Sequence, residues 1–363
     1  MVDGNVASRL VLKERLGEGT QSEVLLGELP EVGAVAVKLG LKQGAIAREA
    51  AVLSTMSAFP GFPTMLHHDE PGPTAPGGFL IVQLLGSSLE DLWGSKSGRL
   101  SAPTLLKVGR GMLRLIRELH TNGFVHNDIK PANILLDAGE ASVPTRLHLI
   151  DFGSCTRANA LDDEAEAEAA GPLRRANGPI GTAMFASISA DDAHSRMRPV
   201  DDIESLTYNL LYLATGSLPW KGKKPDSLAT SIKQEMLTSR DAVAQLTDAV
   251  PCATSAAALC ALWDEVRRCP ADGASIDYDA CMDALGGGAW TGAAAEADAL
   301  SEAAFLAGII PSVTSWYDSG VRLDACVLPA KTVDNVHYQD KLITKPVGKV
   351  VPTADLMKKA GLR

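Results

Sequence analysis

The sequence predicts an α+β protein, in which a small part made mainly of antiparallel strands and one helix precedes a larger helical part. Three observations favour this class. Apolar runs separated by short turns fill residues 10–39, and helical apolar spacing dominates from about residue 101 onward. Alanine is frequent while aromatic residues make up only 5% of the 363 residues. Because alanine is the strongest helix former, this composition does not suit a β-sandwich.

The N-terminal part combines strand patterns with one helical pattern. The expected strands are residues 10–12, 23–26, 34–38 and 79–82, and a further short strand is expected before the loop rich in proline and glycine at 71–78. Glycine or proline interrupts the connections between them, as is typical of turns. Apolar residues in the segment 45–56 recur at helical spacing, so we expect one helix that crosses a small sheet.

The rest of the chain reads as mainly helical. A long helix is predicted from Ser101, a candidate N-cap, to Gly123, and a second, largely apolar helix over residues 202–215. A third helix is predicted over residues 256–266. Past about residue 288 no clear periodicity remains, so we expect a tail that is either partly ordered or disordered.

The charge and the cysteines exclude several classes of protein. A net charge of −10 argues against a nucleic-acid binder or a binder of anionic membranes, because both need a basic surface. The six cysteines form no C-x-x-C pair and no zinc-like spacing with histidine, which favours a reducing compartment. No apolar stretch is long enough to span a bilayer. We therefore expect a soluble, cytoplasmic or nuclear protein.

The strongest local signal is the run H-N-D-I-K-P-A-N, which is followed downstream by I-D-F-G. Phosphoryl transfer needs charge neutralisation and positioning, and hence an acid that orients a hydroxyl and oxygen ligands for magnesium. Asp128 is expected to orient the substrate hydroxyl, and Lys130 to lie against the transferred group. Asn133 and Asp151 are expected to hold magnesium ions through their side-chain oxygens. These four residues are the candidate catalytic residues.

A glycine turn between the first two strands is a candidate phosphate loop. Gly17 and Gly19 would let backbone N–H groups close over phosphates without interference from a Cβ atom. Ser22 stands where a third glycine is usual, and Gln21 replaces the usual aromatic residue at the tip. Alone, this turn is equally explained as a hairpin connection.

Lys38, in the next strand, lies where a kinase keeps the lysine that binds the α- and β-phosphates of ATP. Such a lysine needs an anionic partner, and Glu49 on the following helix is the candidate. The alternative is that Glu49 is a solvated residue on an exposed helix face.

The adenine ring of ATP is expected to meet the backbone at Gln83 and Leu85, with Val82 at the back of the pocket. Apolar residues of the neighbouring strands would form its walls. These are Leu16, Val24, Ala36, Leu135 and Ile150. Each of them is equally explained as a core residue.

Longer motifs in the chain resemble the casein kinase 1 group of eukaryotic-type protein kinases, which includes tau-tubulin kinases and vaccinia-related kinases. They are L-L-G-S-S-L-E-D-L at 84–92, G-T-A-M-F-A-S-I at 181–188 and D-D-I-E-S-L at 201–206. The resemblance covers about residues 8–286. It implies a two-lobed kinase fold, ATP with Mg2+ as cofactors, Ser or Thr as acceptor, and a protein substrate.

The resemblance also implies a division of the chain. The N-lobe would take up about residues 8–84 and the C-lobe about residues 87–286, and residues 287–363 would form an extension of unknown role. Asp202 would be the buried aspartate that accepts hydrogen bonds from the catalytic-loop backbone.

Several residues depart from the group's pattern. Asn127 replaces a common arginine, so activation by phosphorylation of the activation loop is not expected. Met184 replaces an arginine of casein kinase 1, and Pro199 and Val200 replace a basic pair. Those cations favour acidic or phosphorylated substrates, so no such preference is carried over.

An acidic run, D-D-E-A-E-A-E at 162–168, occupies the expected activation segment, and Arg174 and Arg175 follow it. It is either a solvated face or an acidic lip that attracts basic substrates or folds back as a pseudosubstrate. Two other functions remain as alternatives: a pseudokinase scaffold that binds nucleotide, and a phosphotransferase that acts on small molecules. The oligomeric state is not predicted.

Overall fold

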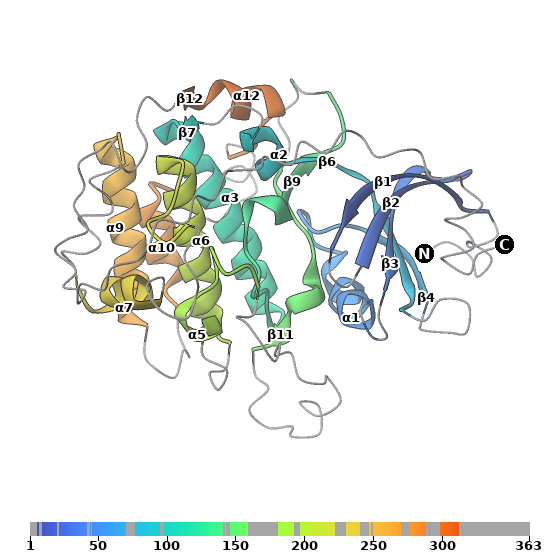
Figure 1. Ribbon diagram of the computed structural model, residues 1–363, viewed down its shortest axis with the longest axis horizontal. Helices are drawn as coiled ribbons and strands as arrows, with labels where there is room; N and C mark the ends of the chain where they lie inside the picture. Colours follow the sequence, from blue (N-terminus) through green and yellow to red (C-terminus); the bar gives the residue numbers. More distant parts are fainter. Residues whose placement is uncertain are drawn as a thin grey trace, which may run out of the picture.

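The computed structural model divides into a strand-rich N-terminal lobe and a helical C-terminal lobe (Figure 1). This confirms the predicted α+β class. The structure describes residues 6, 9–19, 22–41, 44, 46–69, 77–94, 98–140, 142, 146–158, 181–191, 197–221, 230–239, 247, 250–269, 276–287, 290 and 298–311.

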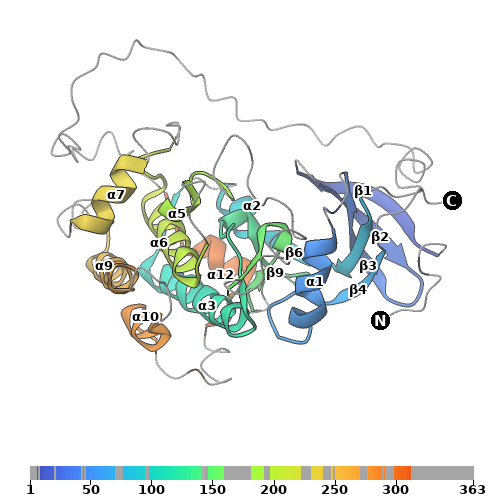
Figure 2. The ribbon, with the colours of Figure 1, turned by 90° about the horizontal axis from the view of Figure 1, so that it is seen from below.

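The N-terminal lobe is built on a five-stranded sheet with the strand order β1-β2-β3-β5-β4, in which every neighbouring pair is antiparallel. Its strands are β1 (Val11–Glu18), β2 (Ser22–Leu29), β3 (Gly33–Gly40), β4 (Met65–Asp69) and β5 (Phe79–Gln83). The predicted helix is α1 (Ala47–Met56), which packs beside this sheet (Figure 2). The four predicted strands and the helix are therefore confirmed, and β4 is the short strand expected between the helix and the loop at 71–78.

The two faces of this sheet bury different residues. Alternate residues of the strands, such as Leu25, Val37 and Ile81, are fully buried in a cluster of their own on one face. On the other face Leu80 joins Leu53 of α1 in the main core, which continues into the C-terminal lobe. Because side chains alternate across a strand, the sheet presents one closed face and one face directed at the second lobe.

The C-terminal lobe is built around a long, almost wholly buried helix. Its described helices are α2 (Leu89–Gly94), α3 (Ala102–Thr121), α5 (Ile188–Asp191), α6 (Pro199–Thr215), α7 (Thr230–Thr238), α9 (Ala253–Arg268), α10 (Tyr278–Ala284) and α12 (Glu302–Ala307). Helix α6 is central and contacts both α3 and α9 (Figure 2). The three predicted helices are α3, α6 and α9. Ser101 occupies the N-cap position of α3, but its hydroxyl lies 3.1 Å from Oγ1 of Thr104 and does not cap the backbone.

Short strands and 3-10 turns complete the described secondary structure. They are β6 (Leu85–Ser88), β7 (Gly98–Leu100), β8 (Phe124–Val125), β9 (Ile134–Asp137), β10 (His148–Leu149), β11 (Thr156–Arg157), β12 (Ile309–Pro311), η2 (Pro131–Asn133) and η3 (Phe152–Ser154). They pair as a three-stranded sheet, β10-β9-β6, and as two ribbons, β11-β8 and β12-β7.

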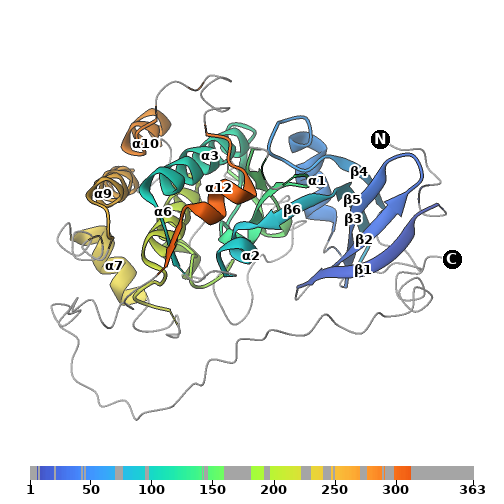
Figure 3. The ribbon, with the colours of Figure 1, turned by 90° about the horizontal axis from the view of Figure 1, so that it is seen from above.

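Part of the expected C-terminal extension is ordered on the C-terminal lobe. Helix α12 lies near α2, and β12 pairs with β7 (Figures 1 and 3). The five cysteines in the described residues are all free. Within the described ranges, no helix combines the length and apolar character that crossing a bilayer would require.

Candidate active site

Lys38 of β3 bridges two carboxylates that come from different parts of the chain. Its Nζ lies 2.5 Å from Oε2 of Glu49 on α1 and 2.7 Å from Oδ1 of Asp151, which follows β10. Glu49 is 5% exposed, so it is not the solvated residue of the alternative interpretation. The predicted pairing of Lys38 with Glu49 is confirmed.

The charges in this group shift its pKa values in different directions. Burial lowers the pKa of Lys38, but the carboxylates of Glu49 and Asp151 outweigh burial and raise it well above its usual value. The ammonium of Lys38 lowers the pKa of Asp151 to about 2. Burial raises the pKa of Glu49, while the charge of Lys38 opposes that rise. Lys38 and Asp151 are therefore both charged at neutral pH.

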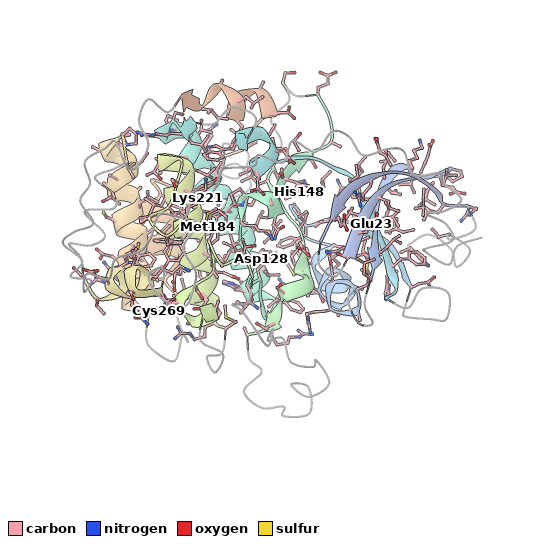
Figure 4. The ribbon with its side chains drawn as sticks, viewed as in Figure 1. Glu23, Asp128, His148, Met184, Lys221 and Cys269 are labelled. Atoms are coloured by element: carbon pink, nitrogen blue, oxygen red, sulfur yellow. The ribbon has the colours of Figure 1, made fainter. Side chains whose placement is uncertain are left out.

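Asp128 lies on the side of the C-terminal lobe that faces the sheet (Figure 4). Hydrogen bonds to both oxygens of its carboxylate fix the direction of the side chain. Oδ1 accepts hydrogen bonds from the backbone N–H of Thr182 at 2.8 Å and from its hydroxyl at 2.9 Å. Oδ2 accepts one from Nζ of Lys130 at 2.7 Å, and the same Nζ lies 3.0 Å from Oγ1 of Thr182. The structure thus brings Asp128 and Lys130 together, as predicted, and adds Thr182 to the group.

Asp202 of α6 holds the backbone just before Asp128. Its fully buried carboxylate accepts hydrogen bonds from the backbone N–H groups of His126 at 2.7 Å and Asn127 at 2.8 Å. Nε2 of His120 lies 2.8 Å from the same carboxylate, and Nδ1 of His120 contacts the hydroxyl of Tyr278. The expected contact between Asp202 and the catalytic loop is confirmed. A buried aspartate needs such donors, because an unsatisfied charge is costly inside a protein.

Asn127 connects the catalytic loop with the start of the activation segment. Its Nδ2 donates to the carbonyl of Ser154 at 2.8 Å and to Oγ1 of Thr156 at 3.0 Å. Its backbone has a φ of 68°, a conformation that asparagine tolerates better than most residues. Gly181 packs against the Asn127 carbonyl, and a Cβ atom on Gly181 would come within 2.3 Å of that oxygen. The neutral side chain at 127 therefore bonds through its NH2 group, while its buried Oδ1 accepts no hydrogen bond within the described residues.

Asn133 and Asp151, the candidate metal ligands, are neighbours across a backbone hydrogen bond from Ile150 to the Asn133 carbonyl, 3.0 Å long. Nδ2 of Asn133 donates to the carbonyl of Asp128 at 2.9 Å, which leaves its amide oxygen available to a cation. The Asp151 side chain is 38% exposed. Magnesium is commonly held by one or two such oxygens together with phosphate oxygens, so this pair fits the ion.

The apolar residues that were expected to line an adenine pocket occupy the more open face of the sheet. Val24, Ala36 and Val82 are all partly exposed, and Ala36 pairs directly with Val82 across β3 and β5. The apolar residues next to them along the strands, Leu25, Val35, Val37 and Ile81, are fully buried. Leu135 and Ile150 are also partly exposed, and Leu16 is 49% exposed. Because these residues are more exposed than their apolar neighbours, the structure favours the interpretation that they face a ligand over the alternative that they are core residues.

Backbone pairing with other segments holds the chain on both sides of the expected adenine hinge. The Gln83 N–H donates to the carbonyl of Thr64 at 2.9 Å, and Leu85 pairs with Asp137 of β9. The segment between them joins the two lobes.

In the glycine turn, the Gly19 N–H donates to the Ser22 carbonyl at 2.8 Å. A Cβ atom on Gly17 would meet nothing within 4 Å. Packing among the described residues therefore does not explain a glycine at position 17. Gln21 lies outside the described residues, as do the acidic run and the two arginines that follow it.

A fully buried lysine, which belongs to none of the predicted motifs, holds the chain after Thr182. Nζ of Lys233 on α7 donates to the carbonyls of Ala183 at 3.2 Å and Ala186 at 2.8 Å. Nε1 of Trp220 donates to the carbonyl between them, that of Met184, at 2.8 Å. Fully buried lysines are rare, but no residue type near Lys233 in the sequence marks this role.

Glu204 of α6 fixes the end of the same segment. Its Oε1 accepts hydrogen bonds from the backbone N–H of Ile188 at 2.8 Å and from the hydroxyl of Tyr208 at 2.7 Å. Burial raises the pKa of Glu204 to about 7. Residues 183–188 are thus held by side chains of α6, α7 and Trp220, and Thr182 is presented to Asp128 from a fixed segment.

A cavity of about 620 Å³ lies apart from this group of residues. It is lined by Phe59, Pro60, Gly111, Arg114, Leu115, Arg117, Glu118, Thr121, Arg146, Leu147, Trp290, Asp298 and Ala299. None of the predicted site residues is among them, and Arg117 is stacked 4.0 Å from the Trp290 ring centre. The candidate site is therefore identified by its side-chain contacts and not by the volume of a cavity.

Comparison with protein families agrees with this geometry. The model of the protein kinase domain matches residues 10–265, which include every predicted site residue. This match covers more than half of the chain, and the two lobes agree with the two-lobed kinase fold. With its strand-rich lobe, its helical lobe and the paired motifs between them, the chain belongs to the eukaryotic-type protein kinase family.

Proposed function

We propose that the protein transfers the γ-phosphoryl group of Mg-ATP to a serine or threonine hydroxyl of a protein substrate, and that it belongs to the casein kinase 1 group. The observation that carries the proposal is the environment of Asp128. Both of its carboxylate oxygens are held in place, and Lys130 lies beside it at 2.7 Å. An acid that is fixed next to a cation matches what phosphoryl transfer requires of an enzyme.

In this proposal each half of the site has its own task. Asp128 orients the acceptor hydroxyl and receives its proton, and Lys130 neutralises charge on the group in transfer. Lys38 binds the α- and β-phosphates while Glu49 and Asp151 hold its ammonium in position. The close contacts among these residues are present without a ligand, which supports an active enzyme.

Asn133 and Asp151 are the proposed magnesium ligands. When bound, magnesium would neutralise the negative charge of the phosphates. The low pKa of Asp151, caused by Lys38, keeps its carboxylate ionised and able to bind a cation at neutral pH. Both side chains belong to short segments that are tied together by backbone hydrogen bonds.

The nucleotide base is proposed to bind against the partly exposed apolar face. Its contacts would be the backbone of Gln83 and Leu85, the glycine turn at Gly17 and Gly19, and a set of apolar walls. The proposed walls are Leu16, Val24, Ala36, Leu135 and Ile150. Their partial exposure supports this, because a preformed apolar surface needs no rearrangement to receive a flat ring.

Membership in the casein kinase 1 group rests on the three motifs at 84–92, 181–188 and 201–206. We propose residues 8–286 as the kinase domain, with residues 287–363 as its extension. Met184 lies in the segment that Lys233 and Trp220 hold, and it supplies no cation for an acidic substrate. The acidic run at 162–168 supports a preference for basic substrates.

The central experiment measures transfer from labelled ATP with magnesium to casein, to histones and to matched peptides that contain Ser, Thr or Tyr. The protein should phosphorylate the Ser and Thr peptides, whereas Asp128→Asn should reduce kcat by roughly a hundredfold or more. Asp283→Asn, on an exposed helix residue, is the control and should retain activity. Thermal stabilisation by ATP with no transfer would instead identify a pseudokinase scaffold.

The substrate preference has a separate test. Replacing the five acids of the run at 162–168 with Ser and Ala should weaken phosphorylation of histones more than that of casein, because the attraction between opposite charges is lost. Equal changes on the two substrates would contradict the proposed basic preference and leave the catalytic proposal intact.

A further inference from the structure

Residues 298–311 pack on the C-terminal lobe, although they lie beyond residue 265, where the match to the protein kinase domain ends. We propose that these residues, the C-terminal brace, fix the strand that follows the adenine hinge, and that Glu302 is a positioning residue for nucleotide binding. This rests on the proposed function, because it takes the backbone near Leu85 as the adenine contact.

A buried carboxylate anchors the start of the brace. Asp298, whose side chain is 6% exposed, accepts hydrogen bonds from Nε of Arg110 at 2.7 Å and from Nη2 of Arg114 at 3.2 Å. Both arginines belong to α3, and Arg110 also donates to the carbonyl of Leu285. Charged hydrogen bonds of this kind are stronger than neutral ones, so the beginning of the brace is firmly attached to α3.

An apolar contact secures the middle of the brace. The side chain of Phe305 on α12 is fully buried in the main core, and Leu300 is 3% exposed in the same cluster. Ser301 caps α12, because its hydroxyl accepts a hydrogen bond from the Ala304 N–H at 3.0 Å. Burial of a phenylalanine stabilises a domain by more than a typical hydrogen bond does, so α12 is part of the folded lobe.

The end of the brace is fixed by backbone pairing. Ile309 pairs with Leu100 in the antiparallel ribbon of β12 and β7. Next to it, the Ser101 N–H donates to the Gly308 carbonyl at 2.7 Å. A Cβ atom on Gly308 would lie 2.2 Å from Oγ1 of Thr104, so only glycine permits this approach. The position of α12 is thereby set relative to the start of α3.

The brace reaches the hinge through one hydrogen bond. The hydroxyl of Ser87 donates to Oε2 of Glu302 at 3.3 Å, and the two residues are 215 positions apart in the chain. Ser87 lies in β6, two residues after Leu85, and β6 is paired on its other side with β9. Helix α12 also contacts α2, which follows β6 directly. Strand β6 is therefore held between β9 and the brace, and the hinge backbone starts from this fixed strand.

The test compares Glu302→Ala, Glu302→Gln and Ser87→Ala in the full-length chain. Glu302→Ala should raise KM for ATP by roughly threefold to tenfold with little change in kcat, because one hydrogen bond to a charged group is lost. Glu302→Gln keeps a side-chain oxygen that can accept this bond and should restore much of the affinity. Ser87→Ala should match Glu302→Ala, and the double variant should add nothing further.

A second readout does not depend on turnover. Binding of ADP with magnesium, measured by calorimetry, should weaken in Glu302→Ala, and amide hydrogen exchange in residues 85–88 should become faster. Glu140→Ala removes an exposed carboxylate and is the matched control, with no change expected. Unchanged affinity and exchange in both Glu302→Ala and Ser87→Ala would overturn the brace proposal. Failure of the unmodified protein to bind nucleotide would instead overturn the proposed function on which it rests.

Discussion

The two halves of the candidate site are held together by different kinds of contact. In the N-terminal half, Lys38 is fixed by the carboxylates of Glu49 and Asp151, so each partner is a side chain. In the C-terminal half, Asp202 and Asn133 bind backbone groups of the catalytic loop. Two side chains that bind each other can be substituted together, whereas a substitution does not remove a backbone N–H group. The difference predicts which half tolerates compensating substitutions.

The largest effect on stability is expected in the C-terminal half. Asp202→Ala leaves the N–H groups of His126 and Asn127 buried without their acceptor, and His120 loses its partner as well. Each unsatisfied group costs about 1–3 kcal/mol, so the free energy of unfolding should fall by at least about 3 kcal/mol. Urea denaturation measures this change, with Asp283→Ala as the exposed control. A loss below about 1 kcal/mol would contradict the contrast between the halves.

In the N-terminal half, single and double substitutions should behave differently. Lys38→Met alone should cost about 3 kcal/mol, because it leaves Glu49 buried without its cation. The double variant Lys38→Met with Glu49→Leu should recover most of this loss, since two apolar residues can replace a buried ion pair. Denaturation of the two single variants and the double variant gives the coupling energy. If the double variant were as unstable as the sum of the single ones, the pair would not be exchangeable as proposed.

Glu204 offers a pH-dependent test within the C-terminal half. Its pKa in the folded protein, about 7, lies above the usual 4.5, so folding favours its protonated form. The contribution of Glu204 to the free energy of unfolding is therefore fully present below about pH 4.5 and is lost as the pH rises through about 7. Relative to Glu204→Gln, the unmodified protein should lose on the order of 3 kcal/mol between these limits. Denaturation at several pH values, with Glu140→Gln beside it, measures the difference, and parallel curves would refute the assignment.

The smallest effect is expected at Thr182, which contacts Asp128 through both its backbone N–H and its hydroxyl. Thr182→Val keeps the backbone N–H that donates to Asp128 but removes the hydroxyl that lies between Asp128 and Lys130. We expect kcat to fall by roughly tenfold with little change in the melting temperature, because the hydroxyl's two hydrogen bonds, to Asp128 and from Lys130, are lost. Thr182→Ser keeps the hydroxyl and should restore the rate. A valine variant with full activity would show that the backbone N–H alone positions Asp128.

The sequence predicted the parts of the site that depend on residue type and short spacing. Lys38 and Glu49 are 11 residues apart, on a strand and the next helix, and their pairing followed from that order. The existence of the strands also followed, but the first one is longer than expected. Strand β1 continues through polar residues to Glu18 because it lies at the edge of the sheet, where charged side chains remain in solvent.

Contacts to backbone groups could not be predicted in the same way. Lys233 binds the carbonyls of Ala183 and Ala186, and a carbonyl leaves no signature in the residue type. The bond between Ser87 and Glu302 joins residues 215 positions apart, and α12 has only six residues, too few for a helical period to be recognised. The casein kinase 1 motifs and the individual roles in catalysis stay predictions.

The amide of Asn127 has a consequence for how such an enzyme could be controlled. It ties the catalytic loop to Ser154 and Thr156 through neutral hydrogen bonds that need no added phosphate. Because these bonds are present in the unmodified chain, adding or removing a phosphate is not needed to form them. The orientation of this loop relative to Ser154 and Thr156 is therefore a property of the fold itself, which favours an enzyme that is active without phosphorylation of its activation segment.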